Sequence, residues 1–240
     1  MTFDSYRPTT ALVGWSPTIR ELQKEAELAA RLNLRVLLGG ECGVGKRRLA
    51  RLIHAESSRR RGPFLRVRCG SDTEARLHTV LFGEGDSASP TPGVFERADG
   101  GAILLQDVDS LTPALQDALI QYLRAGCPGT VAGRPLDVQI LASTRLRLID
   151  KVVAGAFREE LYYLLNTMYL PIPPLRERPE DVEPLLEYFT SYYARRYGIE
   201  RPRLTAEWHA RCRARDWPAN VRDLRATAAT IVTQTAQTPK

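Results

Sequence analysis

The sequence predicts an α/β fold in which helices flank a parallel sheet and a small all-helical subdomain follows. Three observations support this prediction. A glycine-rich phosphate-loop pattern lies between an apolar run and a helical segment, at residues 39–46. Short apolar runs then alternate with amphipathic segments, which is typical of a doubly wound sheet. Later only helical patterns occur, over residues 180–197, 205–215 and 220–233.

Composition indicates a globular protein in a reducing compartment. The 240 residues are 43% hydrophobic, which suits one large α/β domain with a small lid. No apolar run approaches the roughly 20 residues that a membrane helix needs, and the polar residues 1–8 carry no signal region. We therefore expect a cytoplasmic protein without a membrane partner. The four cysteines are widely scattered, and we expect them to be reduced.

The net charge of +6 comes partly from arginine clusters at residues 47–48, 59–61 and 211–215. Such clusters attract nucleic acid or acidic partners in some proteins. No aromatic residues interleave with the arginines here. The sequence therefore favours a solvated basic face over a nucleic-acid interface.

The first expected helix begins at Ser16 and Pro17, a favourable N-cap followed by a favourable first helical residue. Apolar residues then recur at helical spacing, and we expect them to form one buried face. They are Ile19, Leu22, Ala26, Ala29 and Leu32. Residues 1–10, before this helix, are expected to be a flexible lead-in.

A glycine-rich turn follows the apolar run 34–38 and precedes a helix expected to end near residue 57. Its spacing fits the phosphate-loop pattern, in which backbone N–H groups and a helix N-terminus bind polyphosphate oxygens. The candidate nucleotide-binding residues of the turn are Gly40, Glu41, Cys42, Gly43, Val44, Gly45, Lys46 and Arg47. The pattern has Ser or Thr after the lysine, as a Mg²⁺ ligand, where this chain has Arg47. The turn therefore predicts nucleotide binding more strongly than metal-assisted hydrolysis.

Further strands and helices are expected to alternate after the phosphate loop. Strands are expected at residues 63–69, 102–105, 136–142 and 168–172, and helices at residues 73–82, 93–98, 112–123 and 157–165. Residues 84–92 are rich in turn-forming residues and are predicted to form a mobile loop.

Several blocks together make the chain resemble the central AAA+ ATPase domain of bacterial enhancer-binding proteins, the sigma-54-dependent transcriptional activators. The resemblance runs from about residue 12 to about residue 233. Besides the phosphate loop, it rests on residues 63–69, 81–83, 93–101, 157–163, 173–178 and 217–224. It implies a P-loop AAA+ subdomain at residues 11–173 and a helical lid at 174–240. It also implies ATP as the ligand, a ring of self or related AAA+ subunits, and transcription machinery or a regulator protein as partner.

In this family the Walker B strand ends in Asp-Glu, where the Asp holds Mg²⁺ and the Glu orients the attacking water. The matching residues here are Gln106 and Asp107. Gln106 is neutral and a poor Mg²⁺ ligand, and Asp107 is one methylene shorter than Glu. In the alternative, Asp107 binds the metal and Asp109 assists, which requires a register change in a buried strand. Asp107 is the candidate metal ligand, and Mg²⁺ binding stays open.

The resemblance assigns four further positions. The sensor position, Asn in the family, is Arg145, which has no hydrogen-bond acceptor to polarise a water. Of the two arginines that family members insert into the neighbouring subunit's site, Arg158 matches the first and Leu164 falls at the second. An arginine finger contributes roughly 10³–10⁵ in rate in other systems. The lid arginine that contacts the phosphates of its own subunit matches Arg222.

Family activators carry a Gly-Ala-Phe-Thr-Gly-Ala loop, which binds sigma-54, in the segment between Gly83 and Gly93. Here that segment is residues 84–92, which is shorter and contains neither the motif nor an aromatic residue. The family's receiver and helix-turn-helix domains have no counterpart within residues 1–240. We therefore do not expect these residues to bind DNA directly.

Four hypotheses for the function follow. An active ATPase that remodels sigma-54 RNA polymerase is opposed by the missing loop motif and by Gln106. An ATP-binding regulatory module with weak or absent hydrolysis is favoured by the retained Lys46, Arg158 and Arg222. A structural module without nucleotide stays open because Arg47 and further arginines surround the phosphate loop. An unrelated P-loop kinase is disfavoured by the sensor and lid blocks.

Overall fold

The computed structural model describes residues 14–84, 91–126, 130–131 and 134–237. It separates into two compact units, each made of discontinuous segments. The lid unit comprises residues 1–24, 40–45 and 172–240, and the sheet unit comprises residues 25–39 and 46–171. The predicted flexible lead-in at residues 1–10 lies outside the described residues.

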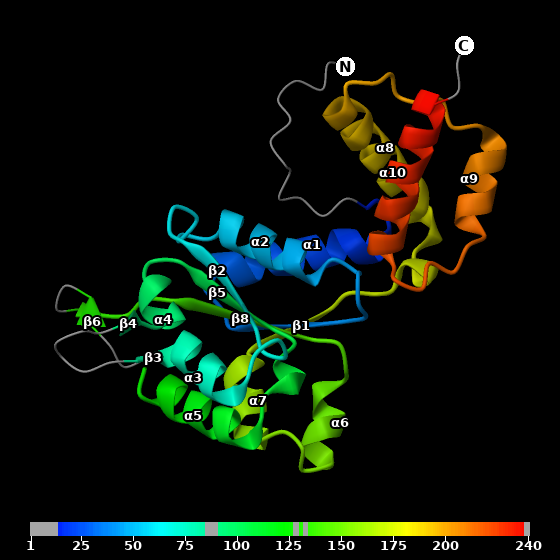
Figure 1. The fold of residues 1–240 in the computed structure, drawn as a ribbon. Coiled ribbons are helices and arrows are strands. Elements are labelled where there is room, and N and C mark those ends of the chain that lie inside the picture. The colour runs from blue at the N-terminus through cyan, green and yellow to red at the C-terminus, as the bar shows by residue number, and fades with distance from the viewer. Residues whose placement is uncertain (1–13, 85–90, 127–129, 132–133, 238–240) are drawn as a thin grey trace. The chain divides into compact units, whose positions relative to one another are not determined.

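The sheet unit is built on a five-stranded parallel sheet with the strand order β2-β5-β8-β1-β9 (Figure 1). The strands are β1 (Val36–Gly39), β2 (Phe64–Arg68), β5 (Ala102–Gln106), β8 (Gln139–Thr144) and β9 (Met168–Pro171). The inner strands β1, β5 and β8 are buried along nearly their whole length, as expected for a sheet covered on both faces. The α/β fold predicted from the sequence is confirmed.

Helices cover both faces of this sheet (Figure 1). On one face lies α2 (Lys46–Glu56), and on the other lie α3 (Glu74–Phe82), α5 (Pro113–Arg124) and α7 (Glu159–Leu165). The unit also contains α4 (Val94–Arg97) and α6 (Leu148–Val153), and α1 (Pro17–Arg31) belongs partly to each unit. The core joins Ile103 and Leu105 of β5 to Leu81, Leu119 and Leu161 of the helices. Burial of each such side chain contributes about 1.5–3 kcal/mol.

Several boundaries differ from the sequence prediction. Leu32, expected on the buried face of the first helix, is 59% exposed. The helix ends one residue earlier, and Asn33 turns the chain with φ of 52°. The strand expected at residues 136–142 runs instead from Gln139 to Thr144. The sequence prediction missed α6, because its six residues are too few for a periodic pattern: Leu148 is buried, but Ile149 and Val153 stay exposed.

Two short hairpins were also missed. Strand β3 (Gly83–Glu84) pairs antiparallel with β4 (Thr91–Pro92), and β6 (Thr130–Val131) pairs antiparallel with β7 (Arg134–Pro135). Two-residue strands are too short to show a periodic pattern in sequence. The first hairpin takes in both ends of the predicted loop at residues 84–92, and its residues 85–90 lie outside the described part of the chain.

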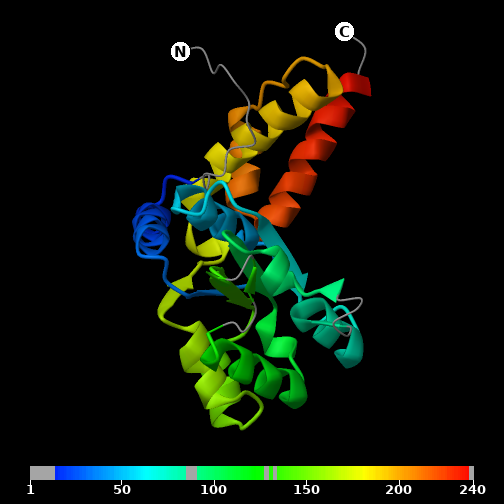
Figure 2. The same cartoon turned by 90° about the vertical axis from the view of Figure 1, so that its left-hand side faces the viewer.

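The lid unit is helical in its C-terminal part, as the sequence predicts. It contains η2 (Leu175–Glu177), η3 (Pro179–Asp181), α8 (Val182–Tyr197), α9 (Ala206–Arg213) and α10 (Val221–Gln237). Helices α8 and α10 pack side by side, as both views show (Figure 1 and Figure 2). Trp217 is fully buried in the core of this unit, and its indole Nε1 donates to the Cys212 carbonyl at 2.9 Å. Within the described residues, every helix is too short or too polar to cross a lipid bilayer.

Candidate functional site

Three neighbouring strands bring the predicted site positions to one edge of the sheet. In the register of the sheet, Gly39 at the end of β1 pairs with Thr144, and Gln106 at the end of β5 pairs with Ser143. The chain therefore leaves the sheet at adjacent points on its carboxyl edge. In open parallel α/β sheets, that edge is where ligands bind.

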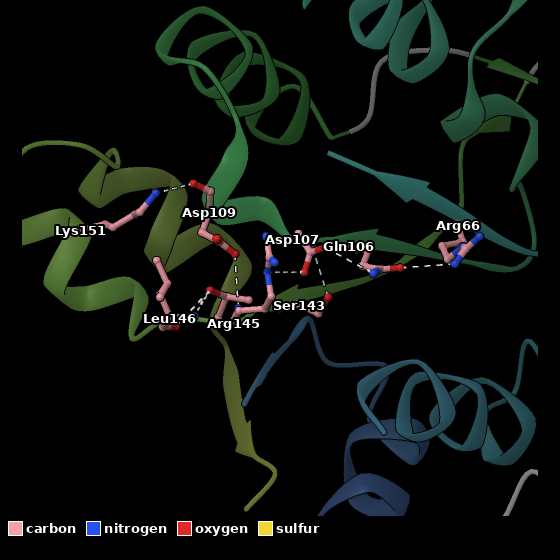
Figure 3. Close-up of polar contacts among 9 residues, drawn as sticks. Arg66, Gln106, Asp107, Asp109, Ser143, Arg145, Leu146 and Lys151 are labelled. Carbon is pink, nitrogen blue, oxygen red and sulfur yellow. Dashed lines mark hydrogen bonds and ion pairs between the residues drawn. The ribbon is translucent and has the colours of Figure 1, made fainter. Parts of the chain in front are cut away.

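A chain of polar contacts runs along this edge, and we call it the polar row (Figure 3). Its members are Arg66, Gln106, Asp107, Asp109, Arg145 and Lys151. Arg66 Nη1 donates to Gln106 Oε1 at 3.4 Å, and Gln106 Nε2 donates to Asp107 Oδ2 at 3.3 Å. The amide of Gln106 therefore links an arginine to a carboxylate.

Asp107 is the centre of the row. Its Oδ1 lies 3.5 Å from Arg145 Nε, with the Asp107 side chain 14% exposed and the Arg145 side chain 51% exposed. The Arg145 backbone N–H donates to Asp109 Oδ1 at 3.4 Å, and Lys151 Nζ donates to the Asp109 carbonyl at 2.6 Å. Charges of opposite sign thus alternate along the row, and Arg145, the predicted sensor residue, pairs directly with Asp107, predicted for the second Walker B position.

The backbone of Asp107 is left-handed, with φ of 59° and ψ of 51°. It ends β5 and begins a single 3₁₀ turn, η1 (Val108–Ser110). This conformation costs a non-glycine residue about 1–3 kcal/mol, and the surrounding hydrogen bonds hold it in place. Among them, the Asp107 N–H donates to Ser143 Oγ at 3.4 Å. The left-handed backbone of Asp107 therefore sets where its carboxylate lies at the end of β5.

The buried thiol of Cys69 lies near the polar row. Burial, reinforced by the negative charges of Asp107 and Asp109, raises the pKa of Cys69 to about 12. The thiol is therefore neutral at physiological pH, and because the thiolate is the reactive form, it is not a nucleophile.

The glycines of the phosphate turn adopt backbone angles that other residues avoid. Gly40, Gly43 and Gly45 have φ of 139°, 85° and 118°. A Cβ atom added at Gly43 would lie 2.0 Å from the Ala219 carbonyl oxygen, and one at Gly40 would lie 2.6 Å from the Ile172 carbonyl oxygen. Both the angles and the close approach require glycine.

Within the lid unit, the phosphate turn is held by residues that the sequence prediction did not single out. Arg176 donates two hydrogen bonds to Glu41, from Nη1 to Oε2 at 2.9 Å and from Nη2 to Oε1 at 2.6 Å. These bonds raise the pKa of Arg176. Asn220 Nδ2 donates to Glu41 Oε2 at 3.1 Å and to the Cys42 carbonyl at 3.0 Å.

Two buried polar residues complete this support. Asn220 is fully buried, and its Oδ1 accepts from the Leu175 N–H at 2.7 Å. Arg178, also buried, donates from Nη2 to the Val44 carbonyl at 3.1 Å. These residues belong to the blocks that carry the family resemblance, yet their identity alone gave no sign that they bind the turn.

The remaining predicted nucleotide contacts divide between the units. Lys46 is the first residue of α2 and is half-buried, and Arg47 after it is exposed. Arg222 is exposed near the start of α10. A Cβ atom at Gly43 would lie 3.3 Å from the Arg222 Cβ, which places Arg222 beside the phosphate turn within the lid unit.

Arg158, the predicted trans arginine, precedes α7 and is half-exposed. Its guanidinium makes two hydrogen bonds to Asp117, Nε to Oδ1 at 2.9 Å and Nη2 to Oδ2 at 3.0 Å, and they raise the pKa of Arg158. Leu164, predicted to lie at the second finger position, packs against the core of the sheet unit. The two positions therefore differ: Arg158 faces solvent, and Leu164 contributes to packing.

Comparison with known families identifies both parts of the chain. Residues 12–171 match the sigma-54 interaction domain, and residues 176–239 match the AAA+ ATPase lid domain. The chain belongs to the sigma-54 interaction domain family. The AAA+ fold and the relation to sigma-54-dependent regulators predicted from the sequence are thereby confirmed.

Curated relatives are bacterial transcription regulators. The C4-dicarboxylate transport transcriptional regulatory protein DctD of Rhizobium meliloti (strain 1021) is 36% identical over 221 residues, covering 89% of this chain and 48% of the relative. The sigma54-dependent transcriptional regulator SfnR of Pseudomonas fluorescens (strain Pf0-1) is 37% identical over 223 residues, covering 90% of this chain and 61% of the relative. The chain spans about half the length of the curated relatives it matches.

Similar solved structures include nucleotide complexes. NtrX from Brucella abortus in complex with ATP superimposes with a TM-score of 0.86 at 32% identity, covering 96% of this chain and 54% of that chain. The complex of the same protein with ADP gives a TM-score of 0.86 at 31% identity, covering 96% and 53%.

Proposed function

We propose that this chain is a sigma-54-interaction AAA+ domain that binds ATP, hydrolyses it weakly or not at all, and acts in transcription regulation. The observation that carries the proposal is the ion pair between Asp107 and Arg145. It joins the second Walker B position to the sensor position, which in the resembled family act on the attacking water.

Nucleotide binding is supported by the phosphate turn. Its glycines have the positive φ angles that a phosphate loop needs, and Lys46 follows at the N-terminus of α2. The backbone N–H groups of such a turn and the helix N-terminus favour anions. The NtrX complexes with ATP and ADP, which superimpose over nearly the whole chain, support the same ligand here. In the proposal, residues 40–47 and Arg222 bind the nucleotide.

Weak hydrolysis is supported by the polar row. A water-activating carboxylate must present an oxygen lone pair to the water, and neighbouring donors compete with the water for that lone pair. Asp107 Oδ1 faces Arg145, and Asp107 Oδ2 accepts from Gln106. Arg145 carries only donors, so it does not replace the acceptor that a sensor amide provides.

For partners, we propose copies of this chain or related AAA+ subunits, arranged in a ring, and a transcription complex or regulator protein. A subunit contact is supported by Arg158, whose side chain is half-exposed. Its ion pair with Asp117 is exposed as well, and an exposed pair is weak enough to be replaced by a contact with a neighbouring subunit. The end of the parallel sheet at Pro171 supports our proposed division into an AAA+ subdomain at residues 11–173 and a lid at 174–240. The compact units differ from this division, because residues 1–24 and 40–45 pack with residues 172–240.

The decisive measurement pairs ATP affinity by calorimetry with phosphate release on the purified chain. We expect binding with little or no release. Lys46→Ala should abolish binding, because it removes the mobile charge of the phosphate loop. Arg48→Ala is the matched control, since it removes a positive charge on the same helix outside the phosphate-loop pattern.

Each other outcome favours another hypothesis. Robust phosphate release would support an active ATPase that remodels sigma-54 RNA polymerase. Absence of ATP binding would support a structural module without nucleotide. Unchanged binding by Lys46→Ala would show that the turn at residues 40–47 is not the nucleotide site.

Sedimentation velocity with and without ATP tests the subunit contact. We expect ATP to promote association and Arg158→Ala to weaken it, because the arginine acts across the interface in this proposal. Arg213→Ala is the control, because it breaks an exposed ion pair between Arg213 on α9 and Glu183 on α8, and this variant should associate like the unmodified chain. A chain that stays monomeric in both conditions would contradict the proposed ring.

A further inference from the structure

The residues at the carboxyl edge of the sheet do not fit Mg²⁺. Phosphate-loop proteins hold this ion with the Ser or Thr hydroxyl after the loop lysine and with a Walker B aspartate. Here those two positions are Arg47 and Gln106. Gln106 has only an amide oxygen, which already accepts from Arg66. In the described part of the chain, no three His, Cys, Asp or Glu side chains cluster to hold a metal ion.

The neighbouring carboxylates are already engaged. Asp107 Oδ1 lies 3.5 Å from Arg145 Nε, and Asp107 Oδ2 accepts from Gln106 Nε2 at 3.3 Å. Asp109 is buried, and its Oδ1 accepts from the Arg145 N–H at 3.4 Å. Mg²⁺ requires near-octahedral oxygen ligands at about 2.0–2.1 Å and gives up its waters reluctantly. An ion bound at either oxygen of Asp107 would lie beside the Arg145 guanidinium or the Gln106 amide N–H groups, and both repel a cation.

The charge of the polar row also opposes a divalent cation. Arg66, Arg145 and Lys151 supply three positive charges against the two carboxylates of Asp107 and Asp109. The excess positive charge repels Mg²⁺ and attracts a polyphosphate anion, and both effects grow where water is excluded. The half-exposed Arg145 guanidinium presents this charge at the strand ends.

We propose that this domain binds its nucleotide as the metal-free anion, with the guanidinium of Arg145 supplying charge that a divalent ion supplies elsewhere. The inference rests on the proposed nucleotide binding and specifies the form of the ligand. In this inference Arg145 determines that the nucleotide binds without Mg²⁺, and it also blocks water activation by Asp107.

The test is calorimetric titration of the full chain with ATP, once in excess EDTA and once in excess Mg²⁺. We expect dissociation constants that agree within about twofold. Binding that is about tenfold or more tighter with Mg²⁺ would overturn this inference and leave the proposed nucleotide binding intact. Absence of binding in both buffers would overturn both.

A double variant, Gln106→Asp with Arg145→Asn, tests the residues responsible. It places a carboxylate at the first Walker B position and frees Asp107, so Mg²⁺ should tighten ATP binding by about tenfold or more. Arg147→Asn removes the same charge from an exposed side chain two residues away, and it should keep equal affinities in both buffers. Equal affinities in the double variant would overturn the assignment to these two residues.

Should the double variant fail to fold, as judged by circular dichroism, Gln106→Asp alone provides a second test. It adds a carboxylate without removing a cation, so we expect Mg²⁺ to tighten ATP binding by about threefold or more. Equal affinities in that single variant would also count against the assignment. The comparison in EDTA and Mg²⁺ on the unmodified chain does not depend on either variant.

Discussion

Arg145 shows how one side chain can change the chemistry at the carboxyl edge of the sheet. The register of β5 and β8 places positions 106 and 143 side by side, and the residues that follow leave the sheet together. An uncharged acceptor at position 145 would leave the Asp107 carboxylate free to bind a water or an ion. The guanidinium instead pairs with that carboxylate. The difference lies in the side chain at position 145.

Arg178 is a second residue whose role depends on its surroundings. Its side chain is 2% exposed, and Nη1 lies 3.6 Å from Asp181 Oδ2. Asp181 is itself fully buried and accepts from the Ser16 N–H at 2.7 Å and from Ser16 Oγ at 2.8 Å. Burial lowers the pKa of Arg178, and Asp181 opposes that shift. The two charges are therefore stable in the interior only as a pair.

We predict that Arg178→Met lowers the free energy of unfolding by about 3–5 kcal/mol, because it leaves Asp181 as an unpaired buried charge. Urea titration followed by circular dichroism measures the loss. Arg176→Met is the matched control: it breaks an exposed pair with Glu41 and should cost about 1 kcal/mol or less. Similar losses in the two variants would contradict the role given to burial.

The phosphate turn is the element whose backbone places the strictest demands on sequence. Gly43 combines φ of 85° with the close Ala219 carbonyl. Gly100 has a comparable φ of 71°, but a Cβ atom there would meet nothing within 4 Å. Comparing alanine substitutions at the two glycines therefore separates the energetic cost of the positive φ angle from that of a steric clash.

We predict that Gly43→Ala weakens ATP binding by about tenfold or more, because the added methyl group forces the turn away from the Ala219 carbonyl. Gly100→Ala should destabilise the fold by about 1–2 kcal/mol and leave ATP affinity unchanged. Calorimetry and urea unfolding on both variants provide the comparison. Equal ATP affinities for Gly43→Ala and the unmodified chain would show that the turn relaxes without loss.

Elements with strong local signals were predicted well. Helices α3 and α5 are capped by Thr73 and Thr112, whose hydroxyls accept from backbone N–H groups in the first turn. The buried run at residues 102–105 was predicted as a strand, and β5 contains it. Helix α6 and the two-residue strands were missed because each is too short to show a periodic apolar pattern, and in α6 only Leu148 is fully buried.

At the scale of the whole molecule, the fold and family were accessible from sequence, and the contacts of the site were not. Sequence and resemblance placed Gln106, Asp107 and Arg145 at strand ends, where the structure has them. The Asp107–Arg145 pair depends on side-chain reach across two strands, which sequence spacing does not contain. The support from Arg178 and Asn220 depends on contacts between residues more than a hundred positions apart, which local patterns do not reveal.

The hydrogen bonds from the lid to the phosphate turn have a consequence for gene fusions of this domain. The carbonyl and carboxylate acceptors of residues 40–45 take their donors from Arg176, Arg178 and Asn220. All three donors lie beyond residue 171, where the match to the sigma-54 interaction domain ends. A gene fusion that joined residues 1–171 to an unrelated partner would leave these acceptors without their donors. A fusion that keeps these contacts therefore has to include residues 176–220 as well.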